Sequence, residues 1–258
     1  LEDSDYPRLL REIAVPPPLL YYRGDLSSLK KPSICIVGSR AATRSGLLIA
    51  KRLAMELSCM GIHVVSGLAR GVDTYAHIGA LESSGGTSAV LGTGIDMIYP
   101  DENRSLAIKI EEKGGAIITE FPPGTPPHRH NFPRRNRLLS GLTLGTIVVQ
   151  AGLKSGAMGT AMWALEQNRD VFAVPGSIES PLSRGPHSLI KKGAHLVESV
   201  EDVVEALNLE GVAPGTGGLL FKVSREKPGS PEGKKPLAEK IISALGSEPK
   251  HIDELVEI

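Results

Sequence analysis

The stretch Ser33-Ile34-Cys35-Ile36-Val37-Gly38-Ser39-Arg40 decides the fold, together with the amphipathic segment that begins at Ser45. A run of four apolar residues at 34–37 is typical of a strand buried on both faces, and the glycine after it predicts a tight turn. From Leu47 to Leu57 the apolar residues have helical spacing, and Gly61 suits the position just beyond a helix end. We therefore expect a strand at 34–37 followed by a helix at 45–60.

The same pattern of short apolar run, small residue and helical segment recurs as far as residue 207. Strands are expected at 34–37, 62–66, 87–91, 116–119, 146–150 and 171–174, with a weaker one at 194–197. Helices are expected at 45–60, 71–84, 102–113, 134–141, 156–167, 186–192 and 200–207. This alternation predicts an α/β fold, a Rossmann-like, doubly wound and mostly parallel sheet with right-handed crossovers.

Two segments fall outside the pattern. Residues 1–31 contain Pro16-Pro17-Pro18 and are expected to form an extended N-terminal lead-in to the domain at 32–207. Residues 208–235 are rich in Gly, Pro, Lys and Glu, a composition typical of a flexible linker. Residues 236–258 are expected to form two short helices, a partial helical segment too small to bury much surface alone.

Composition excludes several classes of protein. The chain has 258 residues, of which 41% are hydrophobic and 22% charged, as in ordinary globular proteins. Its 29 basic and 29 acidic residues cancel, which excludes a globally basic nucleic-acid binder but not a locally basic one. Cys35 and Cys59 make no disulfide framework, and we expect both to be buried free thiols. No membrane span or secretory signal is visible, so a cytoplasmic protein is expected.

Nearly every segment that follows a strand is glycine-bearing, small or basic. Ligands of a parallel sheet bind beyond the carboxyl ends of its strands, where glycine loops and helix N-termini expose backbone N–H groups to phosphates. The segments at those ends are Gly38-Ser39-Arg40, Ser66-Gly67-Leu68-Ala69-Arg70-Gly71-Val72-Asp73, Gly92-Thr93-Gly94, Glu120-Phe121-Pro122-Pro123, Gln150-Ala151-Gly152, Lys154-Ser155-Gly156 and Pro175-Gly176. Together they predict a phosphate-binding edge.

Two long windows of the sequence contain no acidic residue. Residues 26–55 hold Lys30, Lys31, Arg40, Arg44, Lys51 and Arg52, and residues 121–165 hold Arg129, Arg134, Arg135, Arg137 and Lys154. Chance clustering on a solvated face would explain one such window. Because both windows reach the same predicted sheet edge, a groove for a polyanion is the favoured interpretation, with Arg40 and Arg135 facing it from different loops.

The densest cluster is His128-Arg129-His130-Asn131-Phe132-Pro133-Arg134-Arg135-Asn136-Arg137. Arginine guanidinium groups bind phosphates through two parallel hydrogen bonds. Phe132 offers a face on which a base can stack, a contact that contributes about 1–3 kcal/mol in single-strand binders. The alternatives are ordinary packing of Phe132 under a loop and a helix-start cap at Asn136.

Several separate motifs, in order, resemble the DprA/Smf family over residues 6–207. They are Val37-Gly38-Ser39-Arg40, the run from Ser66 to Asp73 with Ala76-His77, Ala89-Val90-Leu91-Gly92, Tyr99-Pro100, Phe132-Pro133-Arg134-Arg135-Asn136-Arg137, Ser155-Gly156 and the run from Val171 to Gly176. The resemblance implies a Rossmann-like domain that binds single-stranded DNA as a homodimer. It also implies that the protein protects incoming DNA and loads the RecA recombinase during natural transformation.

The resemblance places the DNA site on the loops already singled out. The expected nucleic-acid-binding residues are Gly38, Ser39, Arg40, Arg44, Ser66, Gly67, Arg70, Gly71, Arg129, His130, Asn131, Phe132, Arg134, Arg135, Asn136, Arg137, Lys154, Ser155 and Gly156. By the same resemblance, the segment 236–258 is similar to the start of a winged-helix module, and the lead-in to the end of an N-terminal region.

The chain departs from the family pattern at three places. The fifth strand ends in Gln150-Ala151 where the family commonly has Glu-Ala. The Ser-Gly-Ser-Leu-x-Thr-Ala run becomes Ser155-Gly156-Ala157-Met158-Gly159-Thr160-Ala161, and Gly185-Pro186-His187 replaces a Gly-Thr-Asn or Gly-Ser-Asn. The loss of an acid at Gln150 makes the edge less negative, which is compatible with binding a polyanion.

An enzyme of the related LOG-like superfamily is the alternative. Residues 156–160 resemble the phosphate loop of its nucleotide phosphoribohydrolases, but Trp163 stands where that family needs a glutamate, and Glu166 falls one helical turn late. The glycines at 92 and 94 begin a dinucleotide motif, yet Met97 occupies the third glycine position. No P-loop or Gly-x-Ser-x-Gly motif occurs, so neither a catalytic residue nor a cofactor is expected.

The histidines do not indicate a metal site. His128 and His130 lie close in sequence, but no cysteine has the spacing of a structural zinc site. His77 falls four residues after Asp73, on the same face of the expected helix, so a structural hydrogen bond between them is favoured over an acid–base dyad. Asp73 itself suits the first turn of that helix.

Overall fold

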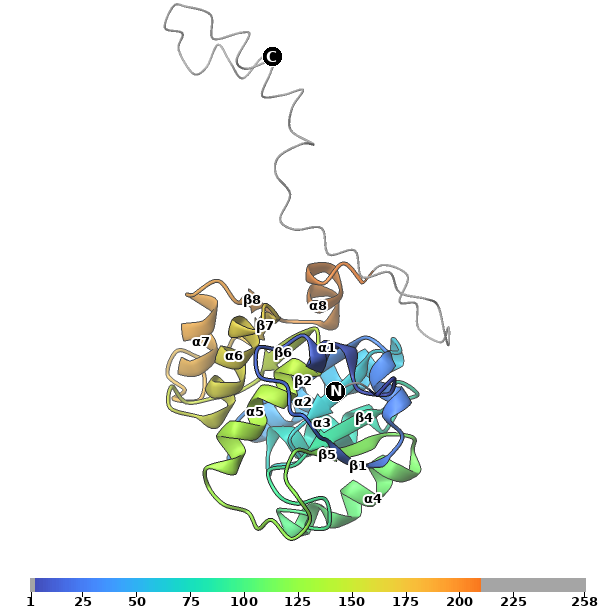
Figure 1. Ribbon diagram of the computed structural model, residues 1–258. Coiled ribbons are helices and arrows are strands. Elements are labelled where there is room, and N and C mark those ends of the chain that lie inside the picture. Colours follow the sequence, from blue (N-terminus) through green and yellow to red (C-terminus); the bar gives the residue numbers. More distant parts are fainter. Residues whose placement is uncertain (1–2, 210–258) are drawn as a thin grey trace, which may run out of the picture. The chain divides into compact units, whose positions relative to one another are not determined.

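The computed structural model describes residues 3–209, which form an eight-stranded sheet with helices on both faces (Figure 1). The strand order is β1-β5-β4-β3-β2-β6-β7-β8. Strand β1 is antiparallel to β5, and the other neighbouring pairs are parallel. The strands are β1 Tyr21–Gly24, β2 Ser33–Val37, β3 His63–Ser66, β4 Thr87–Val90, β5 Ala116–Thr119, β6 Gly145–Val148, β7 Asp170–Ala173 and β8 His195–Leu196.

Each strand and helix expected between residues 32 and 207 is present, with its ends shifted by a few residues, and the predicted α/β class is confirmed. The α-helices are α1 Arg8–Arg11, α2 Arg44–Cys59, α3 Val72–Ala80, α4 Arg104–Glu112, α5 Asn131–Gly141, α6 Gly156–Glu166, α7 Arg184–Ile190 and α8 Val200–Ala206. Two 3₁₀ segments are η1 Leu26–Lys30 and η2 Asp101–Asn103.

Helix α5 begins three residues earlier than the sequence suggested. Pro133 lies outside the helix expected at 134–141, but it is the third residue of α5. In the first turn a backbone N–H has no partner within the helix, so a proline there removes no hydrogen bond. The earlier start places Asn131 and Phe132 in the first turn of α5.

The lead-in is more structured than the extended segment that we expected. It contributes α1, η1 and the edge strand β1, in which Tyr21 pairs with Thr119 and Gly24 with Ala116. Leu10 of α1 is fully buried, and Ile13 just after it is 6% exposed. These elements have only four or five residues each, too few for a periodic pattern to stand out in the sequence.

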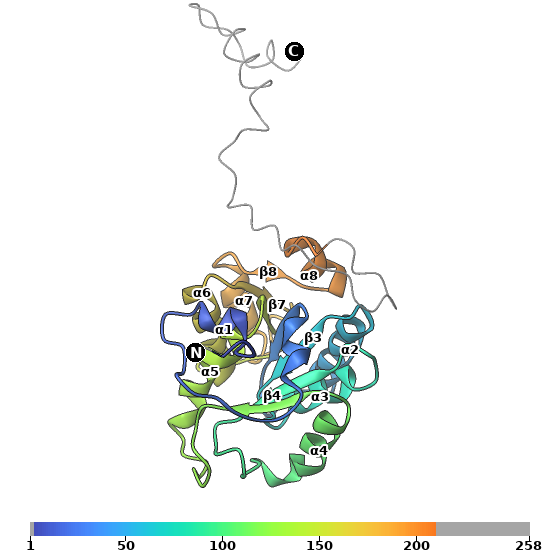
Figure 2. The ribbon, with the colours of Figure 1, turned by 45° about the vertical axis from the view of Figure 1, so that its right-hand side comes forward.

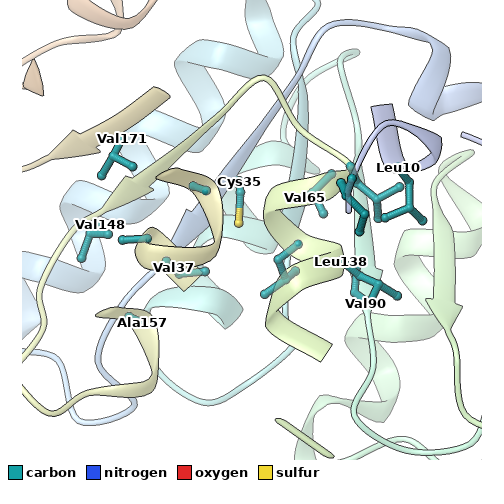
Figure 3. Close-up of a cluster of buried hydrophobic side chains, with 14 of the residues drawn as sticks. Leu10, Cys35, Val37, Val65, Val90, Leu138, Val148, Ala157 and Val171 are labelled. Carbon is teal, nitrogen blue, oxygen red and sulfur yellow. The ribbon is translucent and has the colours of Figure 1, made fainter. Parts of the chain in front are cut away.

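The core has two main layers, one on each face of the sheet. Alternate residues of β2 divide between them: Cys35 and Val37 pack toward one layer, and Ile34 and Ile36 toward the other. The layer around Cys35 includes Leu138 of α5 and side chains of α6 (Figure 3). The opposite layer is covered by α2, α3 and α8, so the sheet is doubly wound (Figure 2).

The chain changes direction across the sheet at β2. From β2 it moves outward through β3 and β4 to β5, then crosses to β6 on the other side of β2 and continues to β7 and β8. Neighbouring β2 and β6 therefore send their connections opposite ways, and ligands of such sheets generally bind beyond the carboxyl ends of the strands at this kind of switch. Ser39 lies there and donates its backbone N–H to the Gln150 carbonyl at 2.6 Å.

One of the two cysteines differs from expectation. Cys35 is buried as expected, but Cys59 at the end of α2 is exposed. Among the helices between residues 3 and 209, none has both the length and the apolarity needed to span a bilayer. The predicted linker and partial helical segment, from residue 210 onward, lie outside the described residues and stay predictions.

Candidate nucleic-acid interface

Loops that follow three different strands meet in one small pocket at the carboxyl edge of the sheet. Its lining residues are Arg40, Gly67, Ala69, Arg70, Tyr99, Pro100 and Phe132. Arg40 comes from the first acid-free window and Phe132 from the second, so the predicted convergence of the two windows is confirmed at this point. We call this set of lining residues the rim pocket.

An aromatic and cationic cluster forms the rim pocket. The guanidinium carbon of Arg40 lies over the Phe132 ring, 5.3 Å from its centroid. The Tyr99 ring lies beside Phe132, with their centroids 5.8 Å apart and their planes tilted by 46°. Phe132 also packs on Gly92, where a Cβ atom would stand 2.8 Å from the ring, so the lack of a side chain there lets the ring settle against the end of β4. Half-exposed rings beside a cation suit a stacked base next to a phosphate.

Gly71 joins the loop after β2 to the loop after β3. Its φ of +79° is in the left-handed region, and a Cβ atom there would stand 2.3 Å from the Ser39 carbonyl oxygen. The next residue, Val72, donates its N–H to the same carbonyl at 3.3 Å. The two loops that carry Arg40 and Arg70 are thereby held against each other by backbone contact.

Arg135 lies inside the protein rather than on the groove. Its residue exposure is 3%, and its Nη1 donates to the Gly67 carbonyl at 2.8 Å and to the Val90 carbonyl. Beside it, the Asp73 carboxylate accepts the Gly67 N–H at 3.1 Å. Burial raises the pKa of Asp73 to about 6, against the opposing effect of the Arg135 charge. The expectation that Arg135 faces the groove is wrong, because this side chain braces the ends of β3 and β4 from below.

Arg137 and Arg134 share an acid that stands just outside the acid-free window. Glu120 is buried, and its Oε2 accepts from Arg137 Nη2 at 2.5 Å and from Arg134 Nη2 at 3.1 Å. Arg137 also donates to the Val15 carbonyl at 2.8 Å and is nearly buried. Arg134 keeps an exposed side chain and lies over the Phe121 ring. Of these two predicted phosphate ligands, only Arg134 therefore reaches the surface.

Other predicted contacts are also internal. Asn136 lies in the middle of α5 and donates to the Gly156 carbonyl at 3.1 Å, so it is not a helix-start cap. The Ser66 hydroxyl donates to the Ile36 carbonyl at 2.6 Å and has no exposed surface. Asn131 is 3% exposed at the start of α5. These residues tie α5 and β3 to their neighbours.

Four of the exposed predicted cations carry no ion pair with a described residue. Arg40, Arg44, Arg129 and Lys154 form no salt bridge with another residue of the range 3–209. Arg44 is the first residue of α2. The helix cap Thr43 donates its backbone N–H and its hydroxyl to Gln150 Oε1, and its Oγ1 is also placed to accept from Gln150 Nε2. Lys154 precedes the α6 cap Ser155, which accepts from the Ala157 N–H at 3.3 Å, and Gly156 is exposed. These groups are free to meet a polyanion.

His77 has a neighbour other than the one expected from the sequence, and His130 lies against His128. His77 is bonded through Nδ1 to Thr87 Oγ1 at 2.7 Å, not to Asp73, so the hydrogen bond expected between the two is wrong. Burial lowers the pKa of His77 to about 3. His130 is exposed and its ring stacks on His128 with centroids 5.3 Å apart. Within the described residues, no three His, Cys, Asp or Glu side chains are grouped to hold a metal ion.

The loop at 156–160 that resembles a nucleotide-enzyme phosphate loop is the first turn of α6. Thr160, whose hydroxyl would bind the phosphate in that comparison, is 1% exposed. Trp163 and Glu166 follow on the same helix, with Glu166 exposed at its end. A buried threonine hydroxyl cannot meet a phosphate at the surface, so the arrangement favours a helix that packs on the sheet.

Tyr99 and Glu102 are members of the site that the sequence did not identify as such. Tyr99 follows the long loop after β4 and lines the rim pocket. Glu102, in η2, forms two hydrogen bonds with Arg70. The sequence did contain a signal for Tyr99. It belongs to the Tyr99-Pro100 motif, and aromatic residues are scarce, at 4% of the chain. The pairing of Glu102 with Arg70 depends on a fold contact between segments more than thirty residues apart.

Comparison with known proteins identifies relatives over this same domain. The family described as DNA recombination-mediator protein A matches residues 1–208. Protein Smf of Escherichia coli is 45% identical over 206 residues, which are 80% of this chain and 55% of that protein, so the chain spans about half the length of this relative.

Two solved structures share the fold at substantial identity. The X-ray structure of DNA processing protein A from Streptococcus pneumoniae has a TM-score of 0.73 and 43% identity, covering 79% of this chain and 71% of that one. A structure of DNA processing protein A from Helicobacter pylori, which addresses its single-stranded DNA binding mode, has a TM-score of 0.72 and 31% identity, covering 81% and 94%.

Proposed function

The chain belongs to the DNA recombination-mediator protein A family, and from that premise we propose that it binds single-stranded DNA along the carboxyl edge of its sheet. The observation that carries the proposal is the rim pocket, where Arg40 and Arg70 flank the Phe132 and Tyr99 rings. Aromatic faces beside cations are the combination by which proteins hold a flexible strand, since bases stack while phosphates are neutralised.

In this proposal, one set of residues binds phosphates and another stacks on a base. Phosphates meet the exposed Arg40, Arg44, Arg129 and Lys154. A base stacks on Phe132, whose position is fixed by its contact with Gly92. Duplex DNA keeps its bases paired and stacked within the helix, so it offers the rings nothing to stack on. We therefore expect a preference for single strands.

The proposal also includes two partners, the RecA recombinase and a second copy of the chain. The family and the resemblance in the sequence support a role in DNA processing during transformation, in which the bound strand is protected and then passed to the RecA recombinase. They also support a homodimer. The action is binding and transfer, so no covalent step is assigned to the rim pocket.

The test is a fluorescence-anisotropy titration of single-stranded and duplex oligonucleotides of one sequence over a range of salt concentrations. The parent should bind the single strand more tightly. Arg40→Ala should weaken binding and reduce the salt slope by roughly 0.7, the share of one single-strand phosphate contact. Arg52→Ala is the matched control, because Arg52 lies about 12 Å further along the helix that Arg44 opens, bonded to the Glu198 carbonyl. Equal binding of the duplex, or equal slopes for the two variants, would contradict the proposal.

A further inference from the structure

Arg70, which lines the rim pocket, is paired with the Glu102 carboxylate. The pairing has the geometry with which an arginine binds a phosphate. Arg70 Nε donates to Glu102 Oε1 at 2.5 Å and its Nη2 to Glu102 Oε2 at 2.8 Å. Two parallel hydrogen bonds from one guanidinium edge are how arginine also binds two phosphate oxygens. The Arg70 and Glu102 side chains are 56% and 54% exposed, so a ligand can reach the bond from solvent.

The partnership is built into the fold rather than left to two mobile surface chains. Asn103, next to Glu102, is buried and donates to the Leu68 carbonyl at 2.8 Å and to Thr74 Oγ1 at 2.9 Å. Leu68 and Thr74 flank Arg70 on either side in the chain. The 3₁₀ segment η2 is thereby fastened to the very loop that carries Arg70, and Glu102 is presented to the guanidinium.

We propose that Glu102 is an internal competitor for nucleic-acid phosphate. Its carboxylate accepts the two parallel hydrogen bonds from Arg70 that a phosphate of the strand accepts instead on binding. This inference rests on the proposed function of the rim pocket. Hydrogen bonding from Arg70 holds the pKa of Glu102 below its ordinary value, so the competitor is ionised at neutral pH. Arg70 stays oriented toward the pocket, and a lone anion must displace the carboxylate to reach it.

Exchange is feasible because the pair is exposed. Water and salt screen an exposed ion pair, so its loss on binding is a small penalty. The freed Glu102 carboxylate rehydrates but stays close to the incoming phosphate and repels it. A strand that also stacks on Phe132 and contacts Arg40 makes additional contacts that offset this repulsion. A short anion has no such additional contacts, so Glu102 favours long strands over small phosphates.

The test compares two variants that remove the same charge one residue apart. Glu102→Gln removes the competitor, whereas Asp101→Asn removes the 82% exposed carboxylate that pairs with Arg104 at 2.7 Å. With a labelled oligothymidylate, Glu102→Gln should bind roughly threefold more tightly at low salt and steepen the salt slope by about 0.7, as one phosphate contact is strengthened. Asp101→Asn should change the affinity and the salt slope much less, because Asp101 pairs with Arg104, which does not line the rim pocket.

A double variant shows whether Glu102 acts through Arg70. In an Arg70→Ala background, adding Glu102→Gln should give no further tightening. Equal effects of Glu102→Gln and Asp101→Asn, persistence of the tightening without Arg70, or weaker binding by Glu102→Gln would each overturn the competitor role. A parent that fails to bind the oligonucleotide would instead overturn the proposed function, so the two failures are distinguishable.

Discussion

Arg40 on the loop after β2 and Arg135 on α5 carry the same guanidinium group to the same end of the sheet, with opposite outcomes. Arg40 is exposed over an aromatic ring, whereas Arg135 is 3% exposed and bonded to two backbone carbonyls. The difference comes from the element that carries each residue. A loop beyond the sheet edge faces solvent, while one face of α5 packs against the sheet.

The comparison teaches that local charge density does not measure the charge available to a ligand. Of the three arginines at 134, 135 and 137, two are buried and two share the buried Glu120. Part of the basic cluster therefore holds the site together from inside. Its removal should affect folding before it affects binding, and the removal of rim residues should do the reverse.

Arg135→Ala should have the largest effect, a loss of unfolding free energy. The change leaves the buried Asp73 without its nearby cation and leaves the Gly67 and Val90 carbonyls without their donor. Removal of one partner of a buried charge pair costs about 3–5 kcal/mol of unfolding free energy. Urea denaturation followed by circular dichroism measures it.

Two controls sharpen this result. Arg40→Ala should change the unfolding free energy by no more than about 0.5 kcal/mol, as expected for an exposed position. Arg135→Lys should fall between parent and Arg135→Ala, since an ammonium keeps the charge but not the planar fork. Equal stability of Arg135→Ala and Arg40→Ala would show that the interior arginine does not brace the strand ends.

Phe132→Leu should have a smaller effect, a loss of affinity for single-stranded DNA. Leucine keeps apolar contact with Gly92 but removes the ring, so affinity for a single-stranded oligonucleotide should fall by about 1–3 kcal/mol. Its salt slope should match that of the parent, because no charge is removed, in contrast to Arg40→Ala. Phe132→Tyr, which keeps a ring, should retain the parent affinity. A loss equal to that of Phe132→Leu in the tyrosine variant would exclude stacking as the reason.

The sequence predicted the sheet and the meeting of loops at its carboxyl edge because each rests on a local pattern. Short apolar runs that end in glycine or a small polar residue identified β2 to β7, and the parallel topology then placed the loops after β2 and β3 together. The burial of Arg135 also had a local signal. It has helical spacing with Leu138, Leu139 and Leu142, which all face the core, so the apolar stripe of α5 includes the arginine.

Other features had no local signal. The pairing of β1 with β5 joins Tyr21 to Thr119, and its four residues are too few to show a period. Glu120 stands just outside the acid-free window, and only the packing of α5 brings it to Arg134 and Arg137. Contacts between residues distant in the chain decide which charges are neutralised, and composition windows do not contain that information.

The central claim is that a single strand lies along the exposed rim and not on the opposite end of the domain. Hydrogen–deuterium exchange with and without a saturating oligothymidylate tests it directly. Amides in residues 38–46, 67–71 and 128–134 should exchange more slowly in the complex, while those in residues 57–61 and 111–115, at the amino edge of the sheet, should be unchanged. Protection of 57–61 or 111–115, with none at 38–46 and 128–134, would contradict the account.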